Sequence, residues 1–260
     1  MNHRYTIILH NMERKWQIFA LVGTSIFMST LDSSIVNVAL PYMMQDLGTD
    51  LQTIQWVVLV YLLVVSSMLL TFGRLSDIKG RKKVYIAGFS IFTMGSLACG
   101  LSTIPVMLVV SRAFQGFGAS MLMACSPAMI IDVFPVNERG KALGLVGAVV
   151  ASGLTAGPVA GGMILEYLSW RFIFLINLPI GITAVGMGLK LLSAPQTDSG
   201  SDEPIDLAGS ILLVLSLAGL IIYLTRIPGW GIASYRSICV AVFSVLMFLF
   251  FAMNERTAQY

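Results

Sequence analysis

Charged side chains are scarce in this chain. Asp, Glu, Lys and Arg make up 11% of its 260 residues, while hydrophobic residues make up 57% and mean hydropathy is +0.84. A soluble domain has about a quarter of its residues charged, so the composition excludes a water-soluble globular enzyme. The net charge of +3 is small. The basic residues lie in short loops beside apolar segments, a pattern that suits a membrane surface and not nucleic acid. The sequence therefore predicts an all-α, polytopic membrane helix bundle.

Groups for catalysis or cofactor binding are also missing. The sequence has no glycine-rich nucleotide loop, which excludes ATP as the energy source in this chain. His3 and His10 lie in a polar leader, and no nucleophile stands at a spacing that suits a base. Cys99, Cys125 and Cys239 fall inside apolar segments without metal-ligand spacing, and are interpreted as small buried residues. We therefore expect no enzyme, no cofactor and no metal site.

Long apolar runs are the dominant feature of the sequence. A membrane span needs about 20 apolar residues, and a window of that length finds eight candidates. They are approximately residues 18–40, 54–72, 84–101, 104–133, 142–165, 172–192, 207–225 and 238–252. Short loops join these helices into one antiparallel bundle. A polar linker at 193–205 divides the chain into a six-helix block, 1–192, and a final helix pair, 206–260, with Asp206 as the expected cap of the seventh helix.

Basic residues are distributed unevenly between the two ends of these spans. The loop 73–83 is the most charged run, and Lys and Arg beside span ends stay on the cytoplasmic side. With the N-terminus inside, twelve Lys and Arg residues lie on that side and only Arg171, Arg226 and Arg236 lie outside. We expect a cell-membrane protein with both termini and the linker in the cytoplasm. The first span is retained, and Met12 is an alternative start.

Two charged residues lie inside predicted spans. Asp32 is in the middle of the first, where a charge costs about 2.5–3.5 kcal/mol on insertion scales. Arg112 cannot lose its proton and needs acceptors or water, and Gln115 lies one turn further on the same helix face. Charges within a membrane mark ion or substrate pathways. The alternatives are a packing role for Asp32 and snorkelling to the outer interface for Arg112.

The fifth span has a row of small residues. Gly153, Gly157 and Gly161 recur at every fourth position, which allows close contact with another helix. Pro158 removes a backbone donor and predicts a kink. A packing face, a hinge and a seal against ion leak are all compatible with this pattern.

Together these stretches resemble the major facilitator superfamily. The charged loop is similar to the signature between the second and third helices of that family. Its matching residues are Gly73, Leu75, Asp77, Gly80, Arg81 and Lys82, while Ile78 stands where the family often has Arg. Residues 112–118 resemble the fourth-helix motif, whose Arg is tied to proton coupling. Residues 153–162 resemble the fifth-helix motif typical of antiporters.

Two further segments resemble the drug:proton antiporters with fourteen helices. They are residues 31–41 in the first helix and residues 170–179, and the tripeptide 55–57 fits the same subfamily. The resemblance covers the chain from residue 18 to about residue 252. It implies an N-terminal half with the central helix pair, whose second six-helix half is absent, with the substrate site between the halves.

The resemblance also implies a role for each motif. Asp32 and Arg112 would couple protons to the movement of a drug-like small molecule. The cytoplasmic gate would be Gly73, Asp77, Gly80, Arg81 and Lys82, and the antiporter motif Gly153, Gly157, Pro158, Gly161 and Gly162. Candidates for the substrate cavity are Asn37, Trp56, Tyr61 and Gln115, although Trp56 and Tyr61 are also interpreted as interfacial aromatic residues.

Three functions remain open from the sequence. The leading one is proton-coupled multidrug efflux. The second is a proton-coupled solute importer of the same fold, against which the motif at Gly157 and Pro158 argues. The third is a non-transporting truncated product, or a half-subunit that needs a second half or a homodimer partner.

Overall fold

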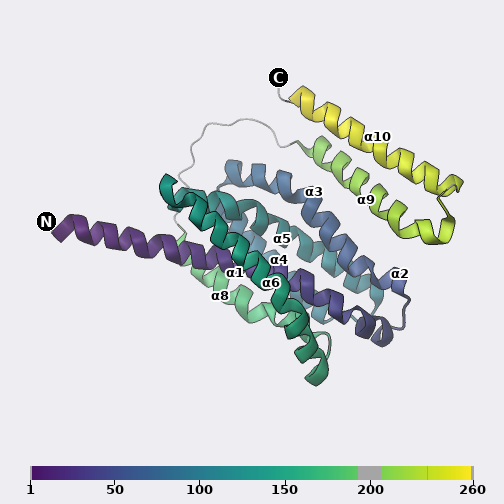
Figure 1. Ribbon diagram of the computed structural model, residues 1–260, viewed down its shortest axis with the longest axis horizontal. Helices are drawn as coiled ribbons and strands as arrows, with labels where there is room; N and C mark the ends of the chain where they lie inside the picture. The colour runs from purple at the N-terminus through teal and green to yellow at the C-terminus, as the bar shows by residue number, and fades with distance from the viewer. Residues whose placement is uncertain (1, 193–205, 233, 259–260) are drawn as a thin grey trace.

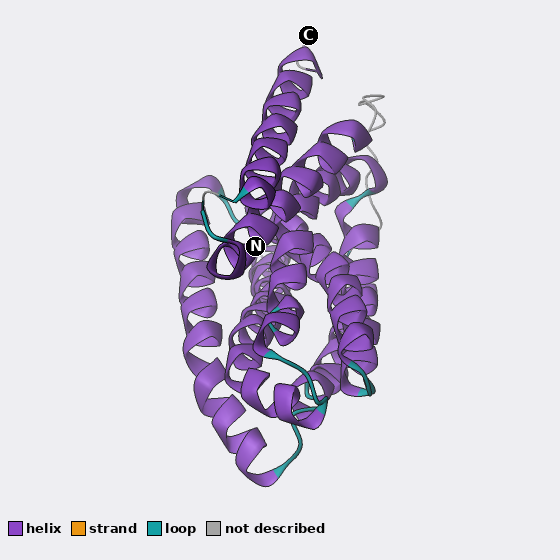
Figure 2. Cartoon of the chain, turned by 90° about the vertical axis from the view of Figure 1, so that its right-hand side faces the viewer, coloured by secondary structure: helices purple, strands orange, loops and turns teal. Residues whose placement is uncertain are grey.

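The computed structural model describes the backbone of residues 2–192, 206–232 and 234–258. Every regular element within these ranges is a helix, and no strand occurs among them (Figure 2). The prediction of an all-α fold is confirmed. The predicted linker at 193–205 lies outside the described residues.

Ten helices follow one another along the described chain. They are α1 (Asn2–Asp46), α2 (Leu51–Ile54), α3 (Trp56–Lys79), α4 (Arg81–Gly100), α5 (Pro105–Val133), α6 (Val136–Tyr167), α7 (Phe172–Leu175), α8 (Asn177–Leu191), α9 (Leu207–Trp230) and α10 (Tyr235–Ala258). In the described residues they provide eight stretches that are long and apolar enough to cross a membrane. This result confirms the eight predicted spans, with α2 and α3 sharing one span and α7 and α8 another.

The helices differ from the predicted spans mainly at their ends. Helix α1 extends beyond the predicted 18–40 in both directions, because a hydropathy window measures apolar length and polar residues also continue a helix. The predicted span 172–192 is divided at Ile176 into α7 and α8. Pro179 lacks the N–H that would bond to the carbonyl of Leu175, so the regular hydrogen-bonding pattern is interrupted there.

Helices α9 and α10 form an antiparallel pair beside the rest of the bundle (Figure 1). Helix α9 packs on α3, and the hydroxyls of Thr71 and Ser210 are hydrogen-bonded across this contact at 2.5 Å. Asp206 caps α9 by accepting the N–H of Gly209 at 2.8 Å, as the sequence predicts. It also accepts the side-chain amide of Asn254 from α10 at 2.6 Å, which ties the pair together.

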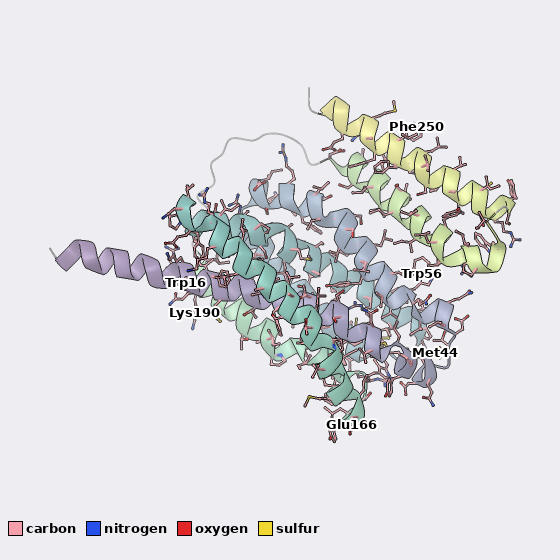
Figure 3. The ribbon with its side chains drawn as sticks, in the orientation of Figure 1. Trp16, Met44, Trp56, Glu166, Lys190 and Phe250 are labelled. Carbon is pink, nitrogen blue, oxygen red and sulfur yellow. The ribbon has the colours of Figure 1, made fainter. Side chains whose placement is uncertain are left out.

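Two clusters of buried apolar side chains fill the bundle one above the other. Along α1, the first cluster ends at Met28 and the second begins at Ile35. Figure 3 labels Trp16 and Lys190 toward one end of the bundle and Met44 toward the other. We call these the Lys190 end and the Met44 end. The stretch of α1 between the two clusters contains Asp32, and the candidate site is built there.

Candidate functional site

A fully buried ion pair lies between the two apolar clusters. Arg112 on α5 donates from Nη1 to Oδ2 of Asp32 on α1 at 2.5 Å, and both side chains have no exposed surface. Arg112 also donates from Nε to the carbonyl of Val57 at 3.0 Å and from Nη1 to Oε1 of Gln115 at 2.7 Å. Its guanidinium stacks on the ring of Tyr61, 4.1 Å from the centroid. Burial excludes the alternative in which Arg112 snorkels to an interface.

Asp32 accepts two further hydrogen bonds. Gln115 Nε2 and Asn177 Nδ2 each donate to Oδ1 of Asp32 at 3.0 Å. Gln115 also donates to the hydroxyl of Ser96 on α4 at 2.8 Å. Helices α1, α3, α4, α5 and α8 therefore all contribute to one network. A buried charge is tolerated only when it is paired and hydrogen-bonded, and this network meets that requirement for Asp32.

The network retains capacity for another polar group. Nη2 of Arg112 and Oδ1 of Asn177 are buried without a hydrogen-bond partner in the described residues. The first is a donor and the second an acceptor. Because a buried unsatisfied group costs about 1–3 kcal/mol, a water molecule or other small polar species that joined the network would be stabilised there.

Asn177 is a member of the network that the site prediction missed, as it also missed Ser96 on α4. Asn177 lies within the quoted segment 170–179, and the signal that points to it is an amide side chain inside an apolar span. Its side chain is 1% exposed. Asn177 is brought to Asp32 by the start of α8, and that proximity depends on how the helices pack.

Replacing Asn177 with Leu tests its contribution to this network. The variant removes one of three donors to the Asp32 carboxylate, so we expect the free energy of unfolding to fall by about 1–3 kcal/mol. Asn37→Leu is the matched control, because Asn37 is exposed and donates only to the Ser33 carbonyl of its own helix. Chemical unfolding of the detergent-solubilised chain measures both. Equal effects of the two variants would show that the contact with Asp32 adds nothing.

The charged loop between α3 and α4 forms a second cluster, at the Lys190 end. Gly80 joins the two helices with φ of +88°, a backbone conformation that residues with a Cβ rarely adopt. Arg81 then reaches Asp132 on α5 with a short hydrogen bond and Asp77 at 3.5 Å. The pairing of Asp77 with Arg81 follows from their i, i+4 spacing. Asp132 is an additional partner that lies at the end of the predicted span 104–133.

The two other residues predicted for this loop lie apart from the ion pairs. Lys82 donates to the backbone carbonyls of Leu189, at 3.2 Å, and Leu192, near the C-terminal end of α8. A cation there suits the unpaired carbonyls and the negative end of the helix dipole. Gly73 has open space around it, since a Cβ added there would meet nothing within 4 Å.

Three glycines of the fifth-span motif bring α6 against α1. A Cβ added at Gly157 would lie 2.5 Å from Cβ of Ser34, one added at Gly161 would lie 2.9 Å from Cγ1 of Ile35, and one added at Gly153 would collide with Thr30. Gly162 is outside this contact, because a Cβ there would meet nothing within 4 Å. The described contacts therefore make residues 153, 157 and 161 a packing face for α1.

Pro158 has a specific consequence for this contact. It has no N–H, so the carbonyl of Leu154 loses its usual partner within α6. Ser34 of α1 donates its hydroxyl to that carbonyl at 2.8 Å. The proline thus exchanges a hydrogen bond within α6 for one between α6 and α1.

The four candidates for a substrate cavity do not gather in one place. Tyr61 and Gln115 belong to the buried network. Trp56 lines a pocket at the Met44 end, and Asn37 is exposed on α1. Within the described residues, no group of three His, Cys, Asp or Glu side chains is placed to bind a metal.

A third polar cluster ties the loops at the Met44 end. Asp46 at the end of α1 accepts Nη1 of Arg171 at 2.8 Å and Nε1 of Trp170 at 3.0 Å. Arg171 also donates to the carbonyl of Ser102, in the connection between α4 and α5, at 3.3 Å. We call Asp46, Trp170, Arg171 and Ser102 the loop clasp.

Residues 22–258 match the family model described as Major Facilitator Superfamily. The chain belongs to this superfamily. The resemblance drawn from the sequence motifs is therefore confirmed. Members of the superfamily are transporters, so the prediction that the chain is not an enzyme holds at the level of the family. The buried network and the loop cluster are accordingly parts of a transporter fold.

Several superfamily members are similar to nearly all of this chain. It is 41% identical over 244 residues to the riboflavin transporter RibZ of Clostridioides difficile. The aligned region covers 94% of the chain and 52% of RibZ. It is 31% identical to the tetracenomycin C resistance and export protein of Streptomyces glaucescens and 32% identical to the multidrug resistance protein Stp of Mycobacterium tuberculosis. Each of these matches covers 94% of the chain and 45% of the relative. The chain thus spans about half the length of these relatives.

Proposed function

We propose that this chain forms the first half, with the following helix pair, of a proton-coupled exporter of drugs or other small amphipathic compounds. The observation that carries the proposal is the buried pair of Asp32 and Arg112 in a superfamily member. Charged residues inside a membrane are costly and serve ion or substrate pathways. Two of the relatives are named for resistance or export, which favours outward movement of the substrate.

Protonation of Asp32 is the proposed coupling step. Arg112 keeps its proton at all relevant pH values, so the carboxylate of Asp32 is the group that exchanges one. A proton on Asp32 removes the charge that holds three donors, from Arg112, Gln115 and Asn177. The contacts of α1 with α5 and α8 then weaken, and the half becomes easier to rearrange around a midplane cavity.

The other motifs receive supporting roles in this proposal. The Lys190 end would face the cytoplasm, because most Lys and Arg residues flank the spans on that side. Gly73, Asp77, Gly80, Arg81 and Lys82 would form the gate there, with Asp132 as the partner of Arg81. The glycines at 153, 157 and 161, with Pro158, would seal α6 against α1 and so limit proton leak.

Dye accumulation in cells that lack their own efflux pumps tests the proposal. The 260-residue chain is expressed alone and together with the second half of a relative, and a fluorescent cationic dye is followed. We expect the protein to lower dye accumulation, and we expect accumulation to rise again to its normal level when the proton gradient is collapsed. Asp32→Asn should abolish the lowering, whereas Glu166→Gln, which removes an exposed acid on α6, should retain it. An Asp32→Asn variant that is present in the membrane and still lowers accumulation contradicts the coupling role.

The same experiment separates the remaining alternatives. Activity only in the presence of a second half identifies a half-subunit, and no activity in either case favours a non-transporting product. The similarity to a protein named riboflavin transporter favours a second candidate, proton-coupled movement of riboflavin. Radiolabelled riboflavin in inside-out and right-side-out vesicles measures both the substrate and the direction.

A further inference from the structure

A pocket of about 280 Å³ lies where the helix pair meets the rest of the bundle, at the Met44 end. It is lined by Asp50, the residue before α2, by Gln52 of α2 and by Trp56 at the start of α3. The first turns of α5 line another side, and Arg226 of α9 lines a third. Figure 3 labels Trp56 between α3 and the end of α9. The pocket therefore depends on both parts of the chain.

The pocket presents one charge of each sign. Asp50 uses one oxygen to accept the N–H of Thr53 at 2.8 Å, and Arg226 donates to Oε1 of Gln52 at 3.3 Å. No ion pair joins Asp50 to Arg226, although both are described residues that line this pocket. The hydrogen bond from Thr53 and the charge of Arg226 keep the pKa of Asp50 below its ordinary value. Asp50 is therefore ionised at neutral pH, and both charges keep capacity for a ligand.

The position of these charges along the spans defines the depth of the pocket. Asp50 directly precedes the span Leu51–Lys79, and Arg226 lies about one turn before the end of the span Ala208–Trp230. The polar rim is therefore at the level of lipid headgroups, where Trp is also enriched. From Pro105, where the next span begins, Val106 and Val110 continue toward the hydrocarbon with 67% and 62% of their surface exposed.

We infer that this pocket binds a zwitterionic phospholipid with a primary ammonium group, phosphatidylethanolamine. Arg226 and the amide of Gln52 would hold the phosphate, Asp50 would hold the ammonium, and one acyl chain would lie along Val106 and Val110. An anionic lipid such as phosphatidylglycerol would gain the contact with Arg226 but would meet the charge of Asp50. In the orientation proposed above, the bound lipid belongs to the outer leaflet.

Native mass spectrometry of the intact chain tests this inference. The protein is purified and mixed with equal amounts of phosphatidylethanolamine and phosphatidylglycerol that carry the same acyl chains. We expect about tenfold stronger retention of phosphatidylethanolamine, and a loss of about tenfold in Arg226→Gln, because a charge-assisted hydrogen bond has this effect on affinity. Arg236→Gln is the matched control, since this exposed arginine on α10 is not among the residues that line the pocket.

Asp50→Asn is the decisive variant. Asn also caps helices, so the helix start is preserved while the negative charge is removed. Retention of phosphatidylethanolamine should fall and that of phosphatidylglycerol should rise, so that the preference between them disappears. Val110→Trp, which fills the apolar wall without altering charge, should lower retention of both lipids. Equal retention by the unmodified chain, a preference for phosphatidylglycerol, or an unchanged preference in Asp50→Asn would overturn the inference.

Discussion

Replacing Arg112 with Met is expected to lower the free energy of unfolding by about 3–5 kcal/mol, because a buried charge is left without its partner. The Asp32 carboxylate would keep the amide donors of Gln115 and Asn177 but lose the guanidinium. The double variant Asp32→Asn/Arg112→Met removes both charges and should regain most of the loss. Unfolding in detergent or lipid nanodiscs, analysed as a double-mutant cycle, measures the coupling between the two positions.

An exposed ion pair is the control for this cycle. Arg171 and Asp46 are 2.8 Å apart, with side chains 31% and 47% exposed. Exposed pairs contribute about 0–1 kcal/mol, so a cycle of Arg171→Met with Asp46→Asn should give a small coupling energy. If the costs of Arg112→Met and Asp32→Asn simply add, the buried pair is not acting as a unit and its proposed place in proton coupling loses its physical basis.

Replacing Gly157 with Val is the second substitution with a large expected effect. The added Cβ would lie 2.5 Å from Cβ of Ser34 and 3.0 Å from the backbone N of Ile35, so α1 and α6 must move apart. Overpacking of a well-packed contact costs about 1–3 kcal/mol and occasionally more. Separation of α6 from α1 would also break the hydrogen bond from Ser34 to Leu154. We expect a clear loss of thermal stability and, in a transporting complex, increased proton leak.

Gly162→Val provides a matched comparison within the same motif. It makes the same chemical change in the same helix, but its Cβ would meet nothing within 4 Å. Any effect of valine on helix formation itself is therefore common to both variants. Thermal unfolding of the two proteins measures their stability. A pH-sensitive dye inside proteoliposomes measures proton leak separately. A Gly162→Val variant as unstable as Gly157→Val would show that the contact with α1 is not the cause.

The sequence predicted the spans well because membrane crossing imposes a length and a hydropathy on each helix. Asp32 and Arg112 were identified as candidates for a similar reason, since a charge in an apolar run is easily recognised. That they bind each other was not predicted. They are separated by 80 positions in the sequence, and hydropathy gives no information about which helices become neighbours.

The same reason explains the partners that the sequence did not reveal. Asn177 reaches Asp32 from 145 positions away, and Asp132 reaches Arg81 from 51 positions away. Each contact requires the rotation of a helix about its axis to be known. The pairing of Asp77 with Arg81 is different, because the two residues are four positions apart and helix geometry alone sets their distance. The polar pocket beside Arg226 depends on how α9 packs on α3, which short-range patterns do not specify.

The loop clasp has a mechanical consequence for the whole half. Asp46, Trp170, Arg171 and Ser102 connect three separate inter-helix connections at the Met44 end. These hydrogen bonds oppose independent movement of the three connections, although an exposed pair such as Asp46 and Arg171 contributes only about 0–1 kcal/mol. The described links at the opposite end are also side-chain contacts: Arg81 and Lys82 join α4 to α5 and α8, and Lys15 of α1 pairs with Glu138 of α6 at 2.5 Å. Both ends of the bundle are therefore joined by partly exposed polar links, whereas the middle is held by a buried pair, so the ends can loosen before the middle does.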